Sequence, residues 1–82
     1  MEKYSITFQY NECLKRLGMD ESKMIPEQKR QLKLMFFAAS AQMLLLLRDD
    51  LSELPELEAC EVLDSMLKEI GDFMTKFMEL QN

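Results

Sequence analysis

The side chains able to do chemistry in this chain are carboxylates and two thiols. The sequence of 82 residues holds fifteen Asp and Glu, two cysteines and no histidine. Histidine performs most general acid–base catalysis, and the Glu-x-x-His motif of di-iron helical bundles requires it. The carboxylates cluster on a stretch that we expect to be solvated, where nothing raises a pKa, and no glycine-rich phosphate loop occurs. We therefore expect a protein that is not an enzyme and needs no cofactor.

The two thiols, Cys13 and Cys60, favour a reducing compartment. The N-terminal sequence MEKYSITFQY contains no apolar segment of the kind found in a signal peptide. We therefore expect a cytoplasmic protein with two free, half-buried cysteines, a disulfide being the alternative. Two thiols without a histidine are too few for a structural zinc site within one chain. The sequence thus predicts no metal site.

Charge is distributed unevenly along the chain. Residues 1–33 hold seven bases and five acids, a net charge of +2, whereas residues 34–82 hold three bases and ten acids, a net charge of −7. An acidic protein without a continuous basic stripe is a poor candidate for binding nucleic acid. The acids could instead form a surface that mimics nucleic acid and occupies the basic groove of a DNA- or RNA-binding protein. This predicted acidic surface comprises Asp49, Asp50, Glu53, Glu56, Glu58, Glu61 and Asp64.

A long apolar run must hold the rest of the chain together. The stretch of residues 34–47 reads LMFFAASAQMLLLL, in which only Ser40 and Gln42 are polar. As a helix it is about 21 Å long, too short to span a bilayer comfortably. Pro26 suits the first position of a helix that continues to about Arg48. We therefore expect a central helix that is apolar on every side and enclosed in protein rather than in a membrane.

A second apolar pattern predicts a helix from Glu53 or Pro55 to Leu80. Its apolar residues recur at heptad spacing, and two pairs at i,i+4, Asp64 with Lys68 and Asp72 with Lys76, are expected to form ion pairs. Gly71 within this helix is expected to permit the close approach of another helix. Three large apolar residues lie near the end of this helix: Met74, Phe77 and Met78. They are expected either to fill the core or to form a groove for a partner's helix.

The segment of residues 3–10 fits either a strand or a helix. Alternation of apolar and polar residues favours a strand, whereas apolar residues at i and i+4 from Ile6 onward favour a helix. Ser5 can cap such a helix and Gly18 can end it. We favour the helix, from about Ser5 to Leu17, because the chain has no second strand with which the first could pair.

The strand alternative implies a different function. Two copies would form a β-ribbon that presents Lys3, Ser5, Thr7 and Gln9 to a DNA groove. Over the first third of the chain this order of elements resembles the ribbon-helix-helix repressors, whose fold implies a dimeric DNA-binding protein. The short segment of residues 11–18 and the acidic balance depart from that family.

Short connections between the helices predict an all-α, up-down antiparallel three-helix bundle, with residues 1–82 as a single helical domain. The first helix is too short to cover the apolar central helix, and a large apolar surface rarely stays in water. We therefore expect a homodimer, and function through protein–protein contacts as an adaptor, regulator or inhibitor. Basic residues at one end and acids at the other would pair in an antiparallel dimer. The predicted interface comprises Phe36, Phe37, Ala39, Met43, Leu44 and Leu47.

Overall fold

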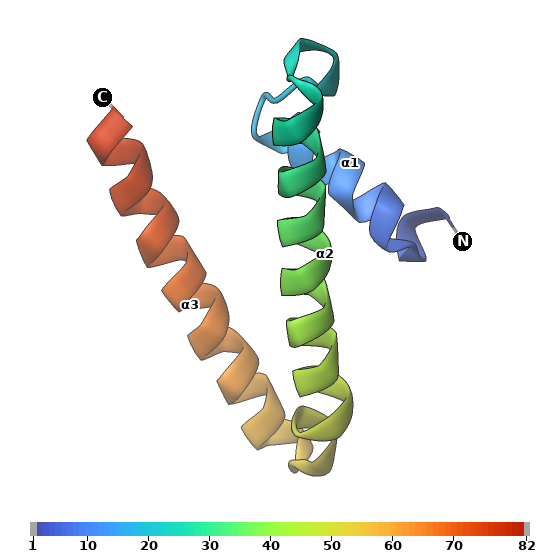
Figure 1. The fold of residues 1–82 in the computed structure, drawn as a ribbon. Helices are drawn as coiled ribbons and strands as arrows, with labels where there is room; N and C mark the ends of the chain where they lie inside the picture. Colours follow the sequence, from blue (N-terminus) through green and yellow to red (C-terminus); the bar gives the residue numbers. More distant parts are fainter. Residues whose placement is uncertain (1, 82) are drawn as a thin grey trace. The chain divides into compact units, whose positions relative to one another are not determined.

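The computed structural model describes residues 2–81, and every regular element within them is helical (Figure 1). The three α-helices are α1 (Ile6–Arg16), α2 (Pro26–Asp49) and α3 (Glu56–Gln81), and three short 3-10 helices precede them: η1 (Glu2–Tyr4), η2 (Glu21–Lys23) and η3 (Leu51–Glu53). The all-α prediction is confirmed. The chain divides into two compact units, Met1–Leu45 and Leu46–Asn82.

Both ends of α1 are set by the residues that the sequence singles out. The hydroxyl of Ser5 accepts a hydrogen bond from the backbone N–H of Phe8 at 3.0 Å, which caps the start of the helix. At the other end Gly18 has a φ of 68°, in the left-handed region that only glycine adopts without strain. The N–H of Gly18 donates to the carbonyl of Lys15, and that of Met19 donates to the carbonyl of Leu14. These two bonds form a Schellman motif, which satisfies carbonyls left free by the last turn.

The strand alternative for residues 3–10 is wrong. Lys3 lies in η1, Ser5 caps α1, and Thr7 and Gln9 lie inside that helix. The alternating pattern is misleading because the same residues also place Ile6 and Tyr10 four positions apart, on one side of a helix. Since the described residues contain no strand, a β-ribbon has no basis in this fold.

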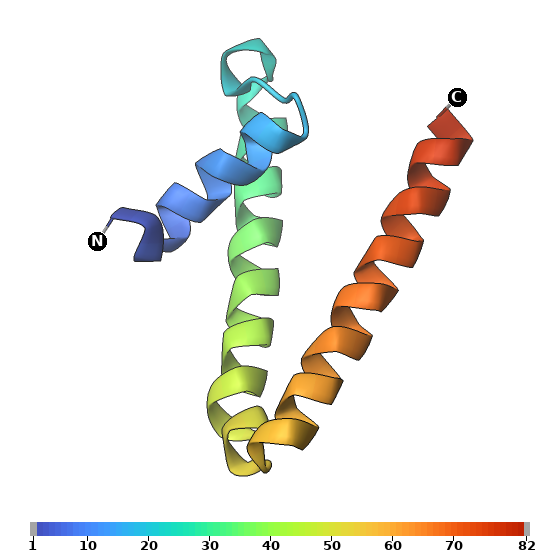
Figure 2. The same cartoon turned by 180° about the vertical axis from the view of Figure 1, so that it is seen from behind.

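Tyr10 is the centre of packing in the first unit. Its side chain is 2% exposed, and its ring meets that of Phe36 edge to face, with the ring centroids 5.4 Å apart. Its hydroxyl donates to Oε2 of Glu21 at 3.2 Å. Burial first, and then this hydrogen bond and the charge of Glu21, raise the pKa of Tyr10. One side chain thus joins α1 to both α2 and η2, and α1 lies across α2 when seen from either side (Figures 1 and 2).

The turn before α2 is organised by Asp20. Its Oδ1 accepts hydrogen bonds from the hydroxyl of Ser22 at 2.7 Å and from the backbone N–H of Ser22 at 2.9 Å. These two bonds stabilise the carboxylate and lower the pKa of Asp20. Pro26 then opens α2 at its first position, as predicted, because a proline there sacrifices no helical hydrogen bond.

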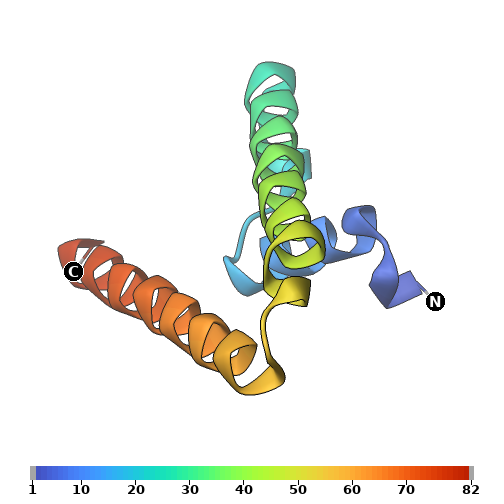
Figure 3. The same cartoon turned by 90° about the horizontal axis from the view of Figure 1, so that it is seen from below.

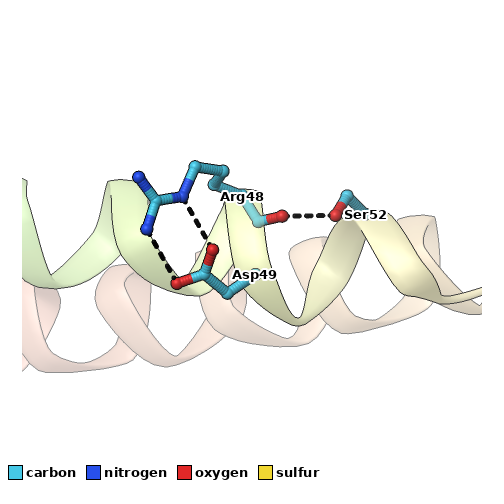
Figure 4. A network of polar contacts seen from close by, with 3 residues as sticks. All are labelled: Arg48, Asp49 and Ser52. Atoms are coloured by element: carbon cyan, nitrogen blue, oxygen red, sulfur yellow. Dashed lines mark hydrogen bonds and ion pairs between the residues drawn. The ribbon is translucent and has the colours of Figure 1, made fainter.

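The second unit begins with a tight turn at the end of α2. Nε of Arg48 donates to Oδ1 of Asp49 at 2.7 Å, and the hydroxyl of Ser52 donates to the carbonyl of Arg48 (Figure 4). Leu51, in η3, is buried with 6% of its surface exposed. The carboxylate of Asp49 raises the pKa of Arg48. The short helix η3 thus connects the carboxyl end of α2 to the start of α3 (Figure 3).

The ion pairs of α3 differ from those predicted from the sequence. Lys68 pairs with Asp72, with Nζ 2.9 Å from Oδ2, instead of with Asp64, and Lys76 does not take Asp72 as its partner. Lys68 has an acid four positions away on each side, so spacing alone does not select the partner. Both members of the observed pair are largely exposed, and such a pair contributes only about 0.3–0.5 kcal/mol to stability.

Candidate interaction surfaces

Most large apolar side chains of this chain lie open to solvent. Among the described residues only Tyr10, Leu14 and Leu51 form the buried hydrophobic core, whereas Leu34 and Met35 on α2 are each 65% exposed and Phe73 on α3 is 66% exposed. Single exposed apolar residues are ordinary, but contiguous apolar surface marks sites of association. Several of these side chains share a face within one unit of the chain.

The first surface is a groove between α1 and α2, which we call the α1–α2 groove. It contains four of the six residues predicted as an interface, and Phe36 forms its base because the ring is held there by Tyr10. The polar amide of Gln9 is already engaged, since its Nε2 donates to the carbonyl of Lys3 at 2.6 Å. The walls of the groove are therefore suited to apolar side chains. They are formed by Ile6, Gln9, Phe36, Ala39, Ser40, Met43 and Leu44.

The other two predicted interface residues lie elsewhere. Leu47 is exposed near the carboxyl end of α2, in the second unit. Phe37 belongs to a different side of α2, where it shares a shallow groove with Arg30, Lys33 and Leu34. We call these four residues the basic face. The predicted interface is thus not one continuous patch.

The basic face combines two cations with exposed apolar surface. Its members are spaced at i, i+3, i+4 and i+7, so they line one side of the helix. The guanidinium of Arg30 meets the carboxylate of Glu27, which also accepts from Gln31. Lys33 forms no ion pair with any residue that the structure describes. This face was not predicted from the sequence, although the spacing of its four residues is visible there.

All seven residues of the predicted acidic surface are exposed. Two of them, Glu58 and Glu61, line a shallow groove on α3 together with Leu54, Val62, Ser65 and Met66. We call these six residues the acidic face. At the other end of the run, Asp49 is held by Arg48. The acids are therefore interleaved with apolar side chains rather than arranged as a purely charged surface.

The predicted groove on the last part of α3 is an exposed helix face. Phe77 is 45% exposed and stacks on Phe73, with the ring centroids 6.3 Å apart. Met74 directly follows Phe73 and Met78 directly follows Phe77 in the sequence, and both methionines are exposed. The aromatic pair makes Phe73 part of this face as well.

The thiols and carboxylates form no recognisable chemical centre. Cys13 is half-buried as predicted, but Cys60, on α3, is exposed. Among residues 2–81, no three His, Cys, Asp or Glu side chains are close enough to hold a metal ion. Within the same range, no helix combines the length and apolar character required to cross a bilayer.

The three surfaces that bear on function are the α1–α2 groove, the basic face and the acidic face. Comparison of the chain with protein-family models, with curated proteins and with solved structures finds no match.

Proposed function

We propose that this chain is a non-enzymatic helical protein that forms a homodimer and acts through protein–protein contacts, as an adaptor, regulator or inhibitor. The observation that carries this proposal is the small buried core beside the many exposed apolar residues of α2 and α3. Exposed apolar surface on this scale is stabilised when a second protein surface removes it from water. A domain of this size also gains few kcal/mol from its own core, so association would contribute much of its stability.

The proposal includes an arrangement of the helices. We propose an up-down three-helix bundle with α2 in the centre, completed by a second copy. The heptad spacing of α3 supports this arrangement, since residues such as Ile70 and Phe77 recur at positions that pack against a neighbouring helix. The short connections support it as well, because they favour antiparallel neighbours.

Sedimentation equilibrium over a range of micromolar concentrations tests the proposal. We expect a monomer–dimer equilibrium without added ligand, and we expect the variant Met43→Glu/Leu44→Glu to shift it toward the monomer because both residues line the α1–α2 groove. Leu57→Glu is the matched control, since Leu57 is 72% exposed and lies outside the three surfaces. A wild-type protein that is monomeric and unfolds cooperatively at every concentration would contradict the proposal.

A second candidate function is suggested by the exposed acids. We propose, as the alternative, an inhibitor that mimics nucleic acid and binds the basic groove of a DNA- or RNA-binding protein. Its support is the row of exposed carboxylates between Asp49 and Asp64, within which no basic residue occurs. The apolar residues between the acids favour the first candidate, because a mimic of the phosphate backbone needs a charged surface throughout.

Displacement of DNA distinguishes the two candidates. The probe is a lysine-rich histone bound to a fluorescently labelled DNA duplex. A mimic releases the duplex, and Glu56→Gln/Glu58→Gln/Glu61→Gln loses this ability because it removes the matching charges. The mimic hypothesis would be rejected if the triple variant still releases the duplex, or if the wild type does not release it.

A further inference from the structure

Two faces of this chain have the same spacing and opposite charge. On the basic face of α2, Arg30 and Lys33 are followed by the apolar Leu34 and by Phe37. On the acidic face of α3, residues at the same offsets of i, i+3, i+4 and i+7 are Glu58, Glu61, Val62 and Ser65, and Met66 lies next to them. Each set lines a shallow groove. On both faces the two charges are followed by apolar residues, Leu34 and Phe37 on α2 and Val62 and Met66 on α3, and the acidic face has one further apolar residue, Leu54, before its charges.

The two faces match in only one direction. If α2 and α3 lie side by side and run in the same direction, Arg30 faces Glu58 and Lys33 faces Glu61. Leu34, which is 65% exposed, and Val62, which is 37% exposed, then flank the contact on its two sides. In the opposite direction Arg30 can face Glu61 and Lys33 can face Glu58, but the apolar residues that follow each charged pair then lie at opposite ends of the contact and leave each other exposed.

A single chain cannot form this parallel match. Arg30 lies about 28 Å from Asp49 along α2, and Glu56 would have to lie a further 3 Å or so beyond Arg30 for Glu58 to reach it. The chain between Asp49 and Glu56 spans at most about 25 Å even when fully extended. Here it is shorter still, because η3 is helical and the hydroxyl of Ser52 is bonded to the carbonyl of Arg48.

We infer that the basic face of one copy binds the acidic face of a second copy, with α2 and α3 running in the same direction. A two-fold dimer forms this contact twice, because each copy carries both faces. Lys33, which has no carboxylate partner among the described residues, gains one in Glu61, and Arg30 shares Glu58 with its neighbour Glu27. The inference rests on the proposed homodimer and adds two charged faces to the apolar α1–α2 groove as surfaces through which the copies bind.

Charge reversal tests the assignment directly. One variant, Arg30→Glu/Lys33→Glu, has two acidic faces, and the other, Glu58→Lys/Glu61→Lys, has two basic faces. By sedimentation equilibrium at low salt, each variant alone should dimerise at least about tenfold more weakly than the wild type, since like charges then face each other. An equimolar mixture of the two should restore dimers, because every face regains an opposite partner. The chain that carries all four substitutions should also dimerise by itself.

The control Glu53→Lys/Glu56→Lys adds the same charge outside the acidic face, because Glu53 lies in η3 and Glu56 lies about 200° around α3 from Glu58, and it should dimerise like the wild type. Far-UV circular dichroism of each variant checks that the helices remain. If a reversal unfolds the chain, the neutral variants Lys33→Gln and Glu61→Gln replace it and should each weaken the dimer.

The possible failures can be distinguished. A wild type that dimerises normally while both reversals leave its affinity unchanged would overturn the assignment of these faces alone, as would a mixture that stays monomeric. A wild type that never dimerises would remove the proposed function together with this inference.

Discussion

Removing the hydroxyl of Tyr10 tests how the first unit is held together. In Tyr10→Phe the ring remains against Phe36, and the single loss is the hydrogen bond to Glu21. A hydrogen bond to a charged group contributes roughly 1.5–3 kcal/mol to stability. Its length of 3.2 Å is long for a hydroxyl donor, and Glu21 is only half-buried, so its carboxylate can turn to water. We therefore expect a loss of about 1 kcal/mol, or roughly fivefold in the unfolding equilibrium.

Two other substitutions bracket this value. Tyr10→Ala also removes a ring that is 2% exposed and should cost about 3–5 kcal/mol, as large aromatic truncations do. Tyr4→Phe is the matched control, because Tyr4 is 71% exposed and its contact with Lys3 uses the face of the ring rather than the hydroxyl. It should leave the free energy of unfolding unchanged.

The same substitution should alter the response to alkaline pH. Burial and Glu21 raise the pKa of Tyr10 in the folded chain above its ordinary value near 10. The stability that depends on the protonated hydroxyl is therefore fully present below about pH 10 and is lost as the pH rises through the folded pKa. Tyr10→Phe has no such group, so its deficit in stability relative to the wild type should diminish as the pH rises above 10.

Urea unfolding followed by far-UV circular dichroism provides the assay, at a fixed protein concentration because dimerisation would add to the apparent stability. The reasoning is refuted if Tyr10→Phe is as stable as the wild type, or as unstable as Tyr10→Ala. In the first case the hydrogen bond contributes nothing. In the second the ring contact with Phe36 contributes nothing beyond the hydroxyl.

Four further substitutions test local features by the same assay. Gly18→Ala should destabilise the chain by about 1–2 kcal/mol, because an L side chain is strained at a φ of 68°. Gly71→Ala should stabilise it by about 0.5–1 kcal/mol, since a Cβ there meets nothing within 4 Å, and a loss instead would support the predicted close helix approach. Ser5→Ala should cost about 1 kcal/mol by freeing the N–H of Phe8, and a neutral result would mean that water replaces the cap. Leu51→Ala should lower the free energy of unfolding by about 2 kcal/mol, near the lower limit for a buried leucine, because the turn that contains Leu51 is small. An unchanged urea midpoint would show that this turn does not depend on the burial of Leu51.

The sequence by itself determined the helix boundaries. Ser5, Gly18 and Pro26 act through the geometry of the adjacent turn, in which a cap, a left-handed residue or a missing N–H has the same effect in any protein. The start and end of α2 and the end of α1 were therefore predicted within about one residue. The segment of residues 3–10 was harder, because alternation and helical spacing coincide there and only the absence of a pairing strand favoured the helix.

The tertiary structure decided which sides of α2 remain open. A helix that is apolar all round gives no sign in its sequence of where a neighbour will lie, so Phe36 and Phe37 were assigned to one interface. Tyr10 covers the side of Phe36 alone, and that contact assigns Phe36 to the α1–α2 groove and leaves Phe37 beside Arg30 on the basic face. Spacing along a helix is a local property, whereas the burial of one side of the helix depends on a segment distant in the sequence. For that reason only the folded chain distinguishes the positions of Phe36 and Phe37.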